Sequence, residues 1–226
     1  MRIWDIDPGF LNAPSLLGEH RELHGLFSIH MNHKKGYSRH PETLRWKTAL
    51  TGLFQRHEIL VREMQLRGMN HKSPLEKPGG TLVWPESWID LPHVQFGLLR
   101  AKYEGKPHGR IPLPDNCQNL WAFHKYSVMA RDPGLYKQIG PAVARNNIRF
   151  DDLALLVTGL LRQPPAVGRM RNVLDHMWGY VSGFSRLWPE TLDLAAQFKE
   201  IQVLSLDYDI TYLIASTALS EIGAWI

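Results

Sequence analysis

The chain has 226 residues, of which 44% are hydrophobic and 21% charged, a composition that excludes disordered and fibrous classes and fits a globular protein. No apolar run approaches the roughly 20 residues needed to cross a bilayer, and the start of the chain turns polar too early for a secretory signal. The single cysteine, Cys117, excludes an internal disulfide and fits a reducing compartment. We therefore expect a cytoplasmic protein without a membrane partner.

Positive charge is concentrated near the N-terminus. Residues 1–75 contain eleven Lys and Arg against seven Asp and Glu, a surplus of four that equals the net charge of the whole chain, +4. Seven of the eleven histidines lie in the same third. A polyanionic partner, if there is one, should therefore meet the N-terminal part of the chain.

The N-terminal third predicts two helices around a basic loop. Pro14 suits a first helical turn, and an apolar stripe predicts a helix over residues 14–27. Residues 30–41 are basic and without periodicity, which predicts an exposed loop. A long helix should cover residues 43–67, with an interruption possible near Gly52 and with Gly68 at its end.

Seven prolines, together with Gly79 and Gly80, punctuate residues 74–114 too often for long helices, which predicts an irregular connector. Helical patterns then return over residues 120–131, 134–145, 151–162 (capped by Asp151 or Asp152), 171–184 and 189–198, before an apolar last stretch. The predicted fold is mainly α, with an N-terminal domain that includes the connector at 1–116 and a helical C-terminal domain at 117–226.

Most short catalytic motifs are absent, because the sequence contains no phosphate-binding glycine loop, nucleophile elbow or cysteine-rich zinc pattern. His20 and His24 stand four residues apart on one helical face, a spacing that can hold a metal. The glutamate of His20-Arg21-Glu22-Leu23-His24 is one place too late for the zincin motif. We therefore expect no metal and no cofactor, and interpret both histidines as bordering the core or facing phosphate.

The chain start permits a different chemistry. An α-amine has an ordinary pKa of about 7.7–8.0, so much of it is neutral and can attack a sugar C1′ to form an imine. Such an amine needs a carboxylate for the cationic sugar and cations for the flanking phosphates. Arg2, Arg21 and Glu22 could supply these groups if the terminus packs across the first helix.

Several stretches of the first third carry a resemblance. They are Met1-Arg2-Ile3, Glu19-His20-Arg21-Glu22-Leu23, Leu26-Phe27, His33-Lys34-Lys35-Gly36, Arg56-His57-Glu58-Ile59-Leu60 and Leu66-Arg67-Gly68-Met69-Asn70. Together they resemble the phage T4-type pyrimidine dimer DNA glycosylases (the endonuclease V family). The specific part is the Arg-Glu-Leu helix and its distance from the terminus.

This resemblance implies an all-α enzyme that attacks the damaged nucleotide with its N-terminal α-amine. The nucleophile falls on Met1, because Arg2 is too bulky for ordinary removal of the initiator methionine, and the catalytic glutamate falls on Glu22. Phosphate-binding arginines fall on Arg2 and Arg21, while Gly25 replaces a further family arginine. With the charge pattern, we expect DNA contacts from Arg2, His20, Arg21, Lys34, Lys35 and Arg39.

The C-terminal half resembles the uncharacterised helical YbgA-type domain, through Phe123-His124-Lys125-Tyr126, Tyr136 with Gly140, and Asn172-Val173-Leu174-Asp175-His176-Met177-Trp178-Gly179-Tyr180. The lysine expected soon after that last tyrosine is missing. Two interpretations remain equal alternatives for His124, Tyr126, Asn172 and His176. They are either buried groups that tie helices together or functional groups.

The resemblances predict a DNA glycosylase with abasic-site lyase activity on damaged pyrimidines, with cyclobutane dimers as the first expected substrate. We expect it in the cytoplasm, associated with the nucleoid. Trp4, Tyr37 and Trp46 could stack on bases, although core positions are commoner for tryptophan. Two alternatives stay open: an enzyme for another modified nucleobase in DNA or RNA, and a non-catalytic nucleic-acid-binding module. The oligomeric state also stays open.

Overall fold

A computed structural model describes residues 2–226, apart from the side chain of Val167, and this part of the chain contains eleven α-helices and no strand. The predicted mainly α fold is confirmed. The longer N-terminal helices are α1 (Ala13–Met31), α3 (Leu50–Leu66) and α4 (Pro92–Lys102), with the short α2 (Pro41–Arg45) between the first two. The C-terminal half contains α5 (Cys117–Met129), α6 (Pro133–Ala144), α7 (Phe150–Leu161), α8 (Met170–Trp178), α9 (Leu194–Asp207), α10 (Thr211–Ile214) and α11 (Ala218–Glu221).

The first predicted helix is confirmed as α1. The Asn12 side chain caps it by accepting a hydrogen bond from the Ser15 N–H at 3.0 Å, and Pro14 occupies the first turn, where its missing N–H costs nothing. The apolar stripe of Leu16, Leu23 and Phe27 is buried, and α1 packs against α3. The stripe thereby fixes which face of α1 stays exposed.

The predicted helix over residues 43–67 is two helices, because the chain leaves helical geometry between Arg45 and Leu50. The break precedes Gly52, which has a different role: a Cβ there would lie 2.3 Å from the Val83 carbonyl oxygen. Glycine thus lets the irregular segment cross α3 closely. Gly68, at φ +71°, follows the end of α3, as expected of a glycine at a helix C-terminus.

The connector is irregular except for α4, which starts at Pro92 because proline fits a first turn. The predicted cap of α7 is wrong. Arg149 precedes that helix without a capping side chain, while Asp151 pairs with Arg149. The predicted helix over 171–184 ends at Trp178, and Asp193 caps α9, which begins later than predicted and runs to Asp207.

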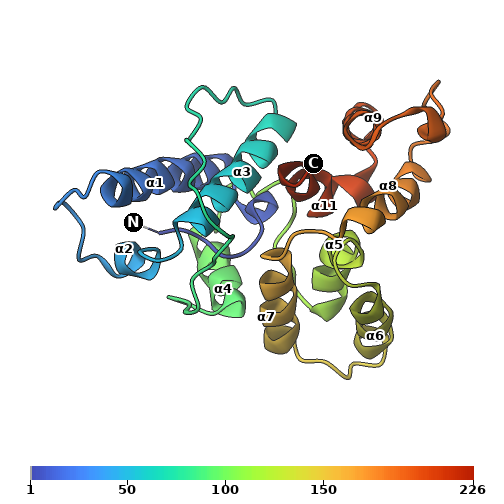
Figure 1. Cartoon of the computed structure of the whole chain (residues 1–226). Helices are drawn as coiled ribbons and strands as arrows, with labels where there is room; N and C mark the ends of the chain where they lie inside the picture. The colour runs from blue at the N-terminus through green and yellow to red at the C-terminus, as the bar shows by residue number, and fades with distance from the viewer. Residues whose placement is uncertain (1) are drawn as a thin grey trace.

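Two clusters of buried hydrophobic residues form the core. The first runs from Ile3 to Leu160 and joins α1, α3 and α4 to α5 and α7, and the second lies among α5, α8, α9 and α11. Figure 1 shows α11 and the C-terminus beside α3, at the centre of the molecule. Because side chains from both sides of residue 116 share one core, the predicted domain boundary stays a prediction. Among the described helices, none has both the length and the apolar character of a membrane span.

Candidate active site

Residues 2–6 form an extended segment whose backbone N–H groups bind side chains of the surrounding helices. The Arg2 N–H donates to Oε2 of Glu22 on α1, and the Trp4 N–H donates to Oε1 of Glu19 at 3.2 Å. The Asp5 N–H donates to Gln95 of α4 at 2.9 Å. These bonds hold Arg2 against Glu22 and the following residues across α1, the packing that sequence reasoning could not establish.

Buried arginines hold the carbonyl groups of the same segment. Arg56 of α3 donates to the Ile6 oxygen at 2.9 Å and pairs with Glu19 at 2.7 Å. Arg45 of α2 donates to the Ile3 oxygen at 3.2 Å. Backbone groups buried away from water need such partners, so the arginines fix the path of the N-terminal segment.

Asp5 links this segment to the C-terminal half of the chain. Its carboxylate lies 2.9 Å from Arg45 Nη1 and 2.7 Å from Arg162 Nη2 at the end of α7. The Arg162 guanidinium in turn lies 3.8 Å from the centre of the Trp88 ring, a cation–π contact. Displacement of the N-terminal segment would therefore break ion pairs that reach α7.

Glu22 is half-buried, and its neighbour Arg21 is exposed on the outer side of α1. The carboxylate that the resemblance names as catalytic is thus accessible and in contact with the Arg2 backbone. Met1, which the resemblance names as the nucleophile, lies outside the described residues. Gly25, which replaces a family arginine, is exposed one turn further along α1, with open space at its Cα.

The Arg2 side chain has two partners that sequence reasoning missed. Its guanidinium pairs with the Asp90 carboxylate, with both side chains 31% exposed, and lies 4.5 Å from the centre of the Trp4 ring. Asp90 directly precedes the segment that leads into α4, and nothing in its local sequence pattern indicates this contact. It offsets part of the positive charge that Arg2 would present to a phosphate.

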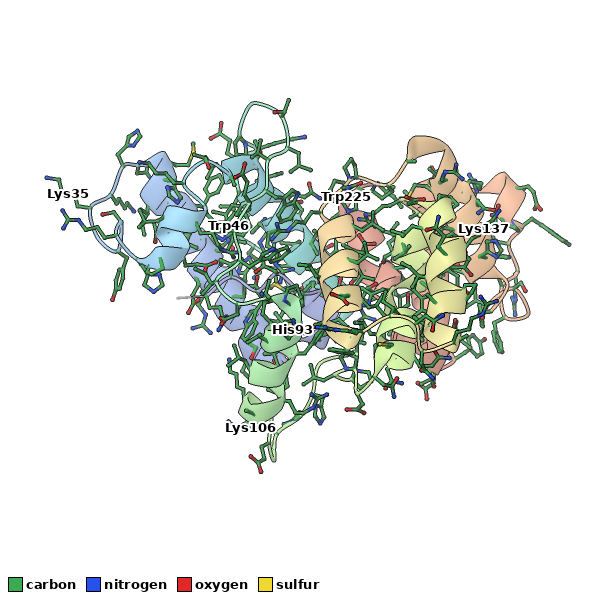
Figure 2. The ribbon with its side chains drawn as sticks, turned by 90° about the horizontal axis from the view of Figure 1, so that it is seen from below. Lys35, Trp46, His93, Lys106, Lys137 and Trp225 are labelled. Atoms are coloured by element: carbon green, nitrogen blue, oxygen red, sulfur yellow. The ribbon has the colours of Figure 1, made fainter. Side chains whose placement is uncertain are left out.

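The predicted basic contacts Lys34, Lys35 and Arg39 lie on the exposed loop between α1 and α2. In Figure 2 Lys35 projects from the far end of the molecule. The loop begins after Met31, so it lies on the order of 14 Å along the α1 axis from Glu22, at 1.5 Å per residue. These cations could meet only phosphates at a distance from the sugar that meets Glu22.

His20 lies in a cluster of four histidines rather than on the exposed face of α1. It is 8% exposed and contacts the rings of His24, His57 and His71, with centroid distances of 4.5, 5.2 and 5.0 Å. Burial, reinforced by the neighbouring imidazoles, lowers the pKa of His20 to about 4 and also lowers the pKa values of His24 and His71. Two sequence signals pointed toward this cluster: the spacing of His20 and His24 on one helical face, and the excess of histidines in the first third.

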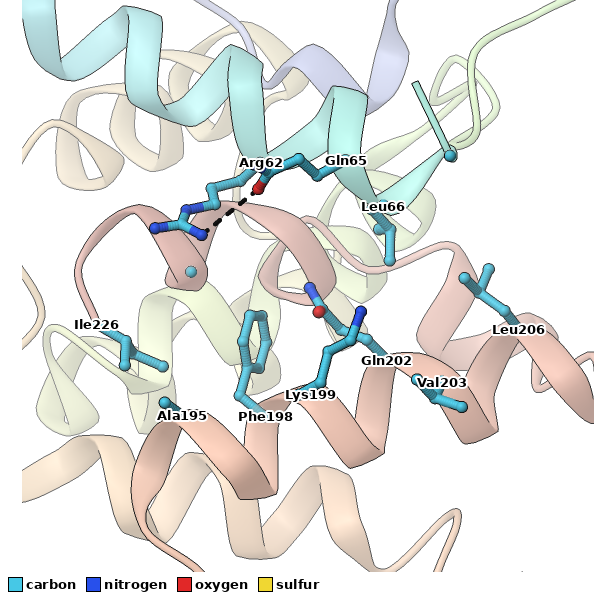
Figure 3. Close-up of a pocket in the computed structure, with 12 residues that line it drawn as sticks. Arg62, Gln65, Leu66, Ala195, Phe198, Lys199, Gln202, Val203, Leu206 and Ile226 are labelled. Carbon is cyan, nitrogen blue, oxygen red and sulfur yellow. Dashed lines mark hydrogen bonds between the residues drawn. The ribbon is translucent and has the colours of Figure 1, made fainter. Parts of the chain in front are cut away.

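A cavity lies away from Glu22, in the groove where α3 meets α9 and the C-terminus. Its volume is about 580 Å³, and Figure 3 shows Phe198 and Gln202 of α9 facing Arg62 of α3 across it. None of the described site residues predicted from the sequence lines it.

The remaining candidates divide between core and surface. Trp4, Trp46, His124 and Tyr126 are buried. The His124 ring stacks on Phe10 at 5.6 Å, which ties α5 to the helical turn that follows the N-terminal segment. Tyr37 is 74% exposed on the basic loop, where a base could stack on it. Asn172 and His176 are exposed on α8.

Comparison with known families divides the chain into two matched parts. Residues 1–77 match the family model of the pyrimidine dimer DNA glycosylases, and residues 125–188 match that of a protein of unknown function (DUF1722). The resemblances noted in the N-terminal third and the C-terminal half are thereby confirmed. Neither the curated proteins nor the solved structures include a significant match.

Proposed function

We propose that the protein is a DNA glycosylase with abasic-site lyase activity on damaged pyrimidines, with cyclobutane dimers as the first expected substrate. The premise is the match of residues 1–77 to the family model of the pyrimidine dimer DNA glycosylases, a family that implies DNA as substrate. The α-amine of Met1 is the proposed nucleophile, and Glu22 is the proposed catalytic carboxylate.

One observation carries the proposal: the Arg2 N–H donates a hydrogen bond to the Glu22 carboxylate. Arg2 directly follows the proposed nucleophile, so the carboxylate is bound by the residue next to the amine. A binding module needs neither a free terminus nor a carboxylate against it. This juxtaposition of terminus and carboxylate therefore favours an enzyme over a module that only binds nucleic acid.

The proposed reaction has two parts. The neutral amine attacks C1′ of the damaged nucleotide while the base leaves with the electrons of the glycosidic bond and takes up a proton. The nitrogen loses its protons as the sugar ring opens, which leaves an imine. Removal of a C2′ proton then expels the 3′ phosphate by β-elimination and cleaves the strand. The Glu22 carboxylate stabilises the cationic sugar and transfers protons.

The surrounding contacts favour this chemistry because they hold the reacting groups in place. The ion pair of Arg56 with Glu19 is buried, with side chains 5% and 0% exposed, and both residues bind the backbone of the N-terminal segment. A segment ordered before substrate arrives loses less entropy in the transition state. Arg21, exposed beside Glu22, is available to a phosphate of the bound strand.

Borohydride trapping tests the proposal. Borohydride should reduce the imine and link the full chain covalently to an oligonucleotide with an abasic site, and peptide mass analysis should place the adduct on the Met1 α-amine. An N-terminal tag should abolish trapping. An adduct on a lysine would contradict the proposed nucleophile, and the absence of any adduct would favour a non-catalytic module.

Glu22→Gln separates catalysis from DNA binding. The amide keeps the size of the side chain and loses its charge, so glycosylase and lyase rates should fall on the order of 100-fold or more while DNA affinity changes little. Glu104→Gln is the matched control, because Glu104 is exposed in the turn after α4. Parallel assays on dimer-containing strands and other modified bases would identify the substrate.

A further inference from the structure

Four histidines from three segments direct ring nitrogens toward one point. His20 and His24 lie on successive turns of α1, His57 lies on α3, and His71 lies in the irregular segment after α3. One nitrogen from each residue can be chosen so that all four lie within 4.8 Å of one another. His20 and His57 are buried, and His24 and His71 are half-buried.

The spacing approaches that of a tetrahedral metal site. Zinc binds imidazole nitrogen at about 2.0–2.1 Å, so two nitrogens of a regular tetrahedron lie about 3.3–3.4 Å apart. The Nε2 atoms of His20 and His24 are already 3.2 Å apart. The wider pairs, up to 4.8 Å, need to close by about 1.5 Å at most, a change within reach of small rotations of the rings.

Two of these nitrogens are buried and lack a partner within the described structure. Nε2 of His57 and Nε2 of His71 accept and donate no hydrogen bond there, and the His57 side chain is 0% exposed. A buried polar atom without a partner destabilises a fold, so native structures satisfy nearly all of them. A cation bound between the four rings would satisfy both nitrogens through their lone pairs.

The opposite side of the His57 ring has a partner typical of a metal ligand. Its Nδ1 lies 2.8 Å from Oε1 of Glu58. A ligating imidazole usually donates its second N–H to a carboxylate, which fixes the tautomer and leaves the other nitrogen free to bind metal. For His57 this arrangement leaves Nε2, the buried nitrogen without a described partner, available to a metal ion.

We propose that His20, His24, His57 and His71 bind one divalent transition-metal ion, with Zn²⁺ the expected occupant. Imidazole suits zinc and its neighbours in the first transition row, whereas Mg²⁺ and Ca²⁺ require oxygen ligands. Four protein ligands leave no open position for substrate, so the site is structural. It fastens the start of the segment after α3 to α1 and α3.

The metal site is separate from the proposed catalytic site. Successive residues of an α-helix are 100° apart, so Glu22 lies about 160–200° around α1 from His20 and His24. Glu22 thus faces the N-terminal segment while the two histidines face His57 and His71. The inference goes beyond the proposed function, and each can fail without the other.

Metal analysis of the purified full chain is the first test. We expect about one zinc per chain, and after chelation and dialysis we expect one Co²⁺ per chain to give the intense visible absorption of a tetrahedral site. X-ray absorption of the zinc form should show nitrogen neighbours only, at about 2.0 Å. Less than a tenth of an equivalent of any transition metal, together with no cobalt spectrum, would overturn the proposal.

Variants assign the ligands. His24→Gln and His71→Ala, at the two half-buried positions, should each lower metal affinity at least tenfold and remove the tetrahedral cobalt spectrum. His176→Gln, at an exposed histidine of α8, is the control and should bind metal as the unchanged chain does. Chelation should lower the Tm of the unchanged chain and of the control by several degrees, and that of the ligand variants by much less.

Full metal binding by both ligand variants would also overturn the assignment. If either variant fails to fold, the stoichiometry, the cobalt spectrum and the X-ray absorption of the unchanged chain still decide whether the site exists. None of these metal measurements depends on the imine chemistry that borohydride trapping tests.

Discussion

Replacing Arg45 with Met removes the cation that holds the N-terminal segment from α2. The Arg45 side chain is 2% exposed and lies 2.9 Å from Asp5 Oδ1 and 2.5 Å from Glu42 Oε1. It also donates to the Ile3 carbonyl. Methionine fills a similar volume without charge, so the substitution removes the electrostatic contacts and leaves most of the packing.

The expected loss of stability follows from the contacts that Asp5 and Glu42 keep in Arg45→Met. Asp5 keeps its ion pair with Arg162, but Glu42, at 3% side-chain exposure, keeps only the Trp46 indole N–H at 2.9 Å among its described side-chain partners. Breaking a buried ion pair at one partner costs about 3–5 kcal/mol. At about 2–4 °C per kcal/mol for a chain of this length, we expect Tm to fall by roughly 6–20 °C.

Urea unfolding and thermal unfolding of the full chain measure this loss. Arg62→Met is the matched control, because Arg62 is exposed on α3 and its hydrogen bond to Gln65 is long, at 3.4 Å. The double variant Glu42→Gln/Arg45→Met should regain at least about 1 kcal/mol, since the amide oxygen still accepts the Trp46 N–H and the uncompensated charge is gone. A loss in Arg45→Met no larger than in the control would refute the reasoning.

The same variant tests whether the segment positions the amine. At a temperature where Arg45→Met stays folded, the borohydride trapping rate should fall about tenfold or more, because small displacements of reacting groups are costly. An unchanged rate would show that the clamp stabilises the fold without serving the chemistry.

Three further predictions concern DNA affinity and pH. Arg2→Ala and Arg21→Ala should each lower the slope of log affinity against log salt by about one. Lys35→Ala, in the solvated loop, should lower it less reliably, and binding titrations at several salt concentrations measure all three slopes. Asp90→Asn should strengthen DNA binding in the same titrations, because it frees the Arg2 guanidinium and removes a negative charge, and weaker binding would show that Asp90 positions Arg2. Burial, with Glu63 nearby, raises the pKa of Asp7 from 3.8 to about 7. The folded state therefore binds a proton that the unfolded state releases between about pH 4 and 7, and the free energy of unfolding falls as pH rises over that interval. Asp7→Asn should therefore gain stability relative to the unchanged chain over that interval, up to about 4 kcal/mol. Urea unfolding at pH 4.5 and 8 measures this, and a difference in unfolding free energy between the two chains that does not change with pH would contradict the shift.

Local sequence patterns determined most of the helices. Asn12, Pro14 and the apolar stripe define α1, because capping and helical periodicity depend on residues within a few positions of one another. The same patterns placed a possible interruption near Gly52 rather than between Arg45 and Leu50, and they missed the late start of α9, since helix ends depend on neighbours in space as well as on propensity. The stretches between Met1 and Asn70 that carry the resemblance were enough to indicate the family whose model matches residues 1–77.

Tertiary structure alone decided which of these residues meet. The contact of the Arg2 N–H with Glu22 joins residues 20 positions apart, and the pairing of Arg2 with Asp90 joins residues 88 apart. His57 and His71 each fit an ordinary helix and loop, and they become a candidate metal site only where α3 packs on α1. Contacts at such separations depend on how the helices pack, and single-sequence periodicity reports only which face of each helix is buried.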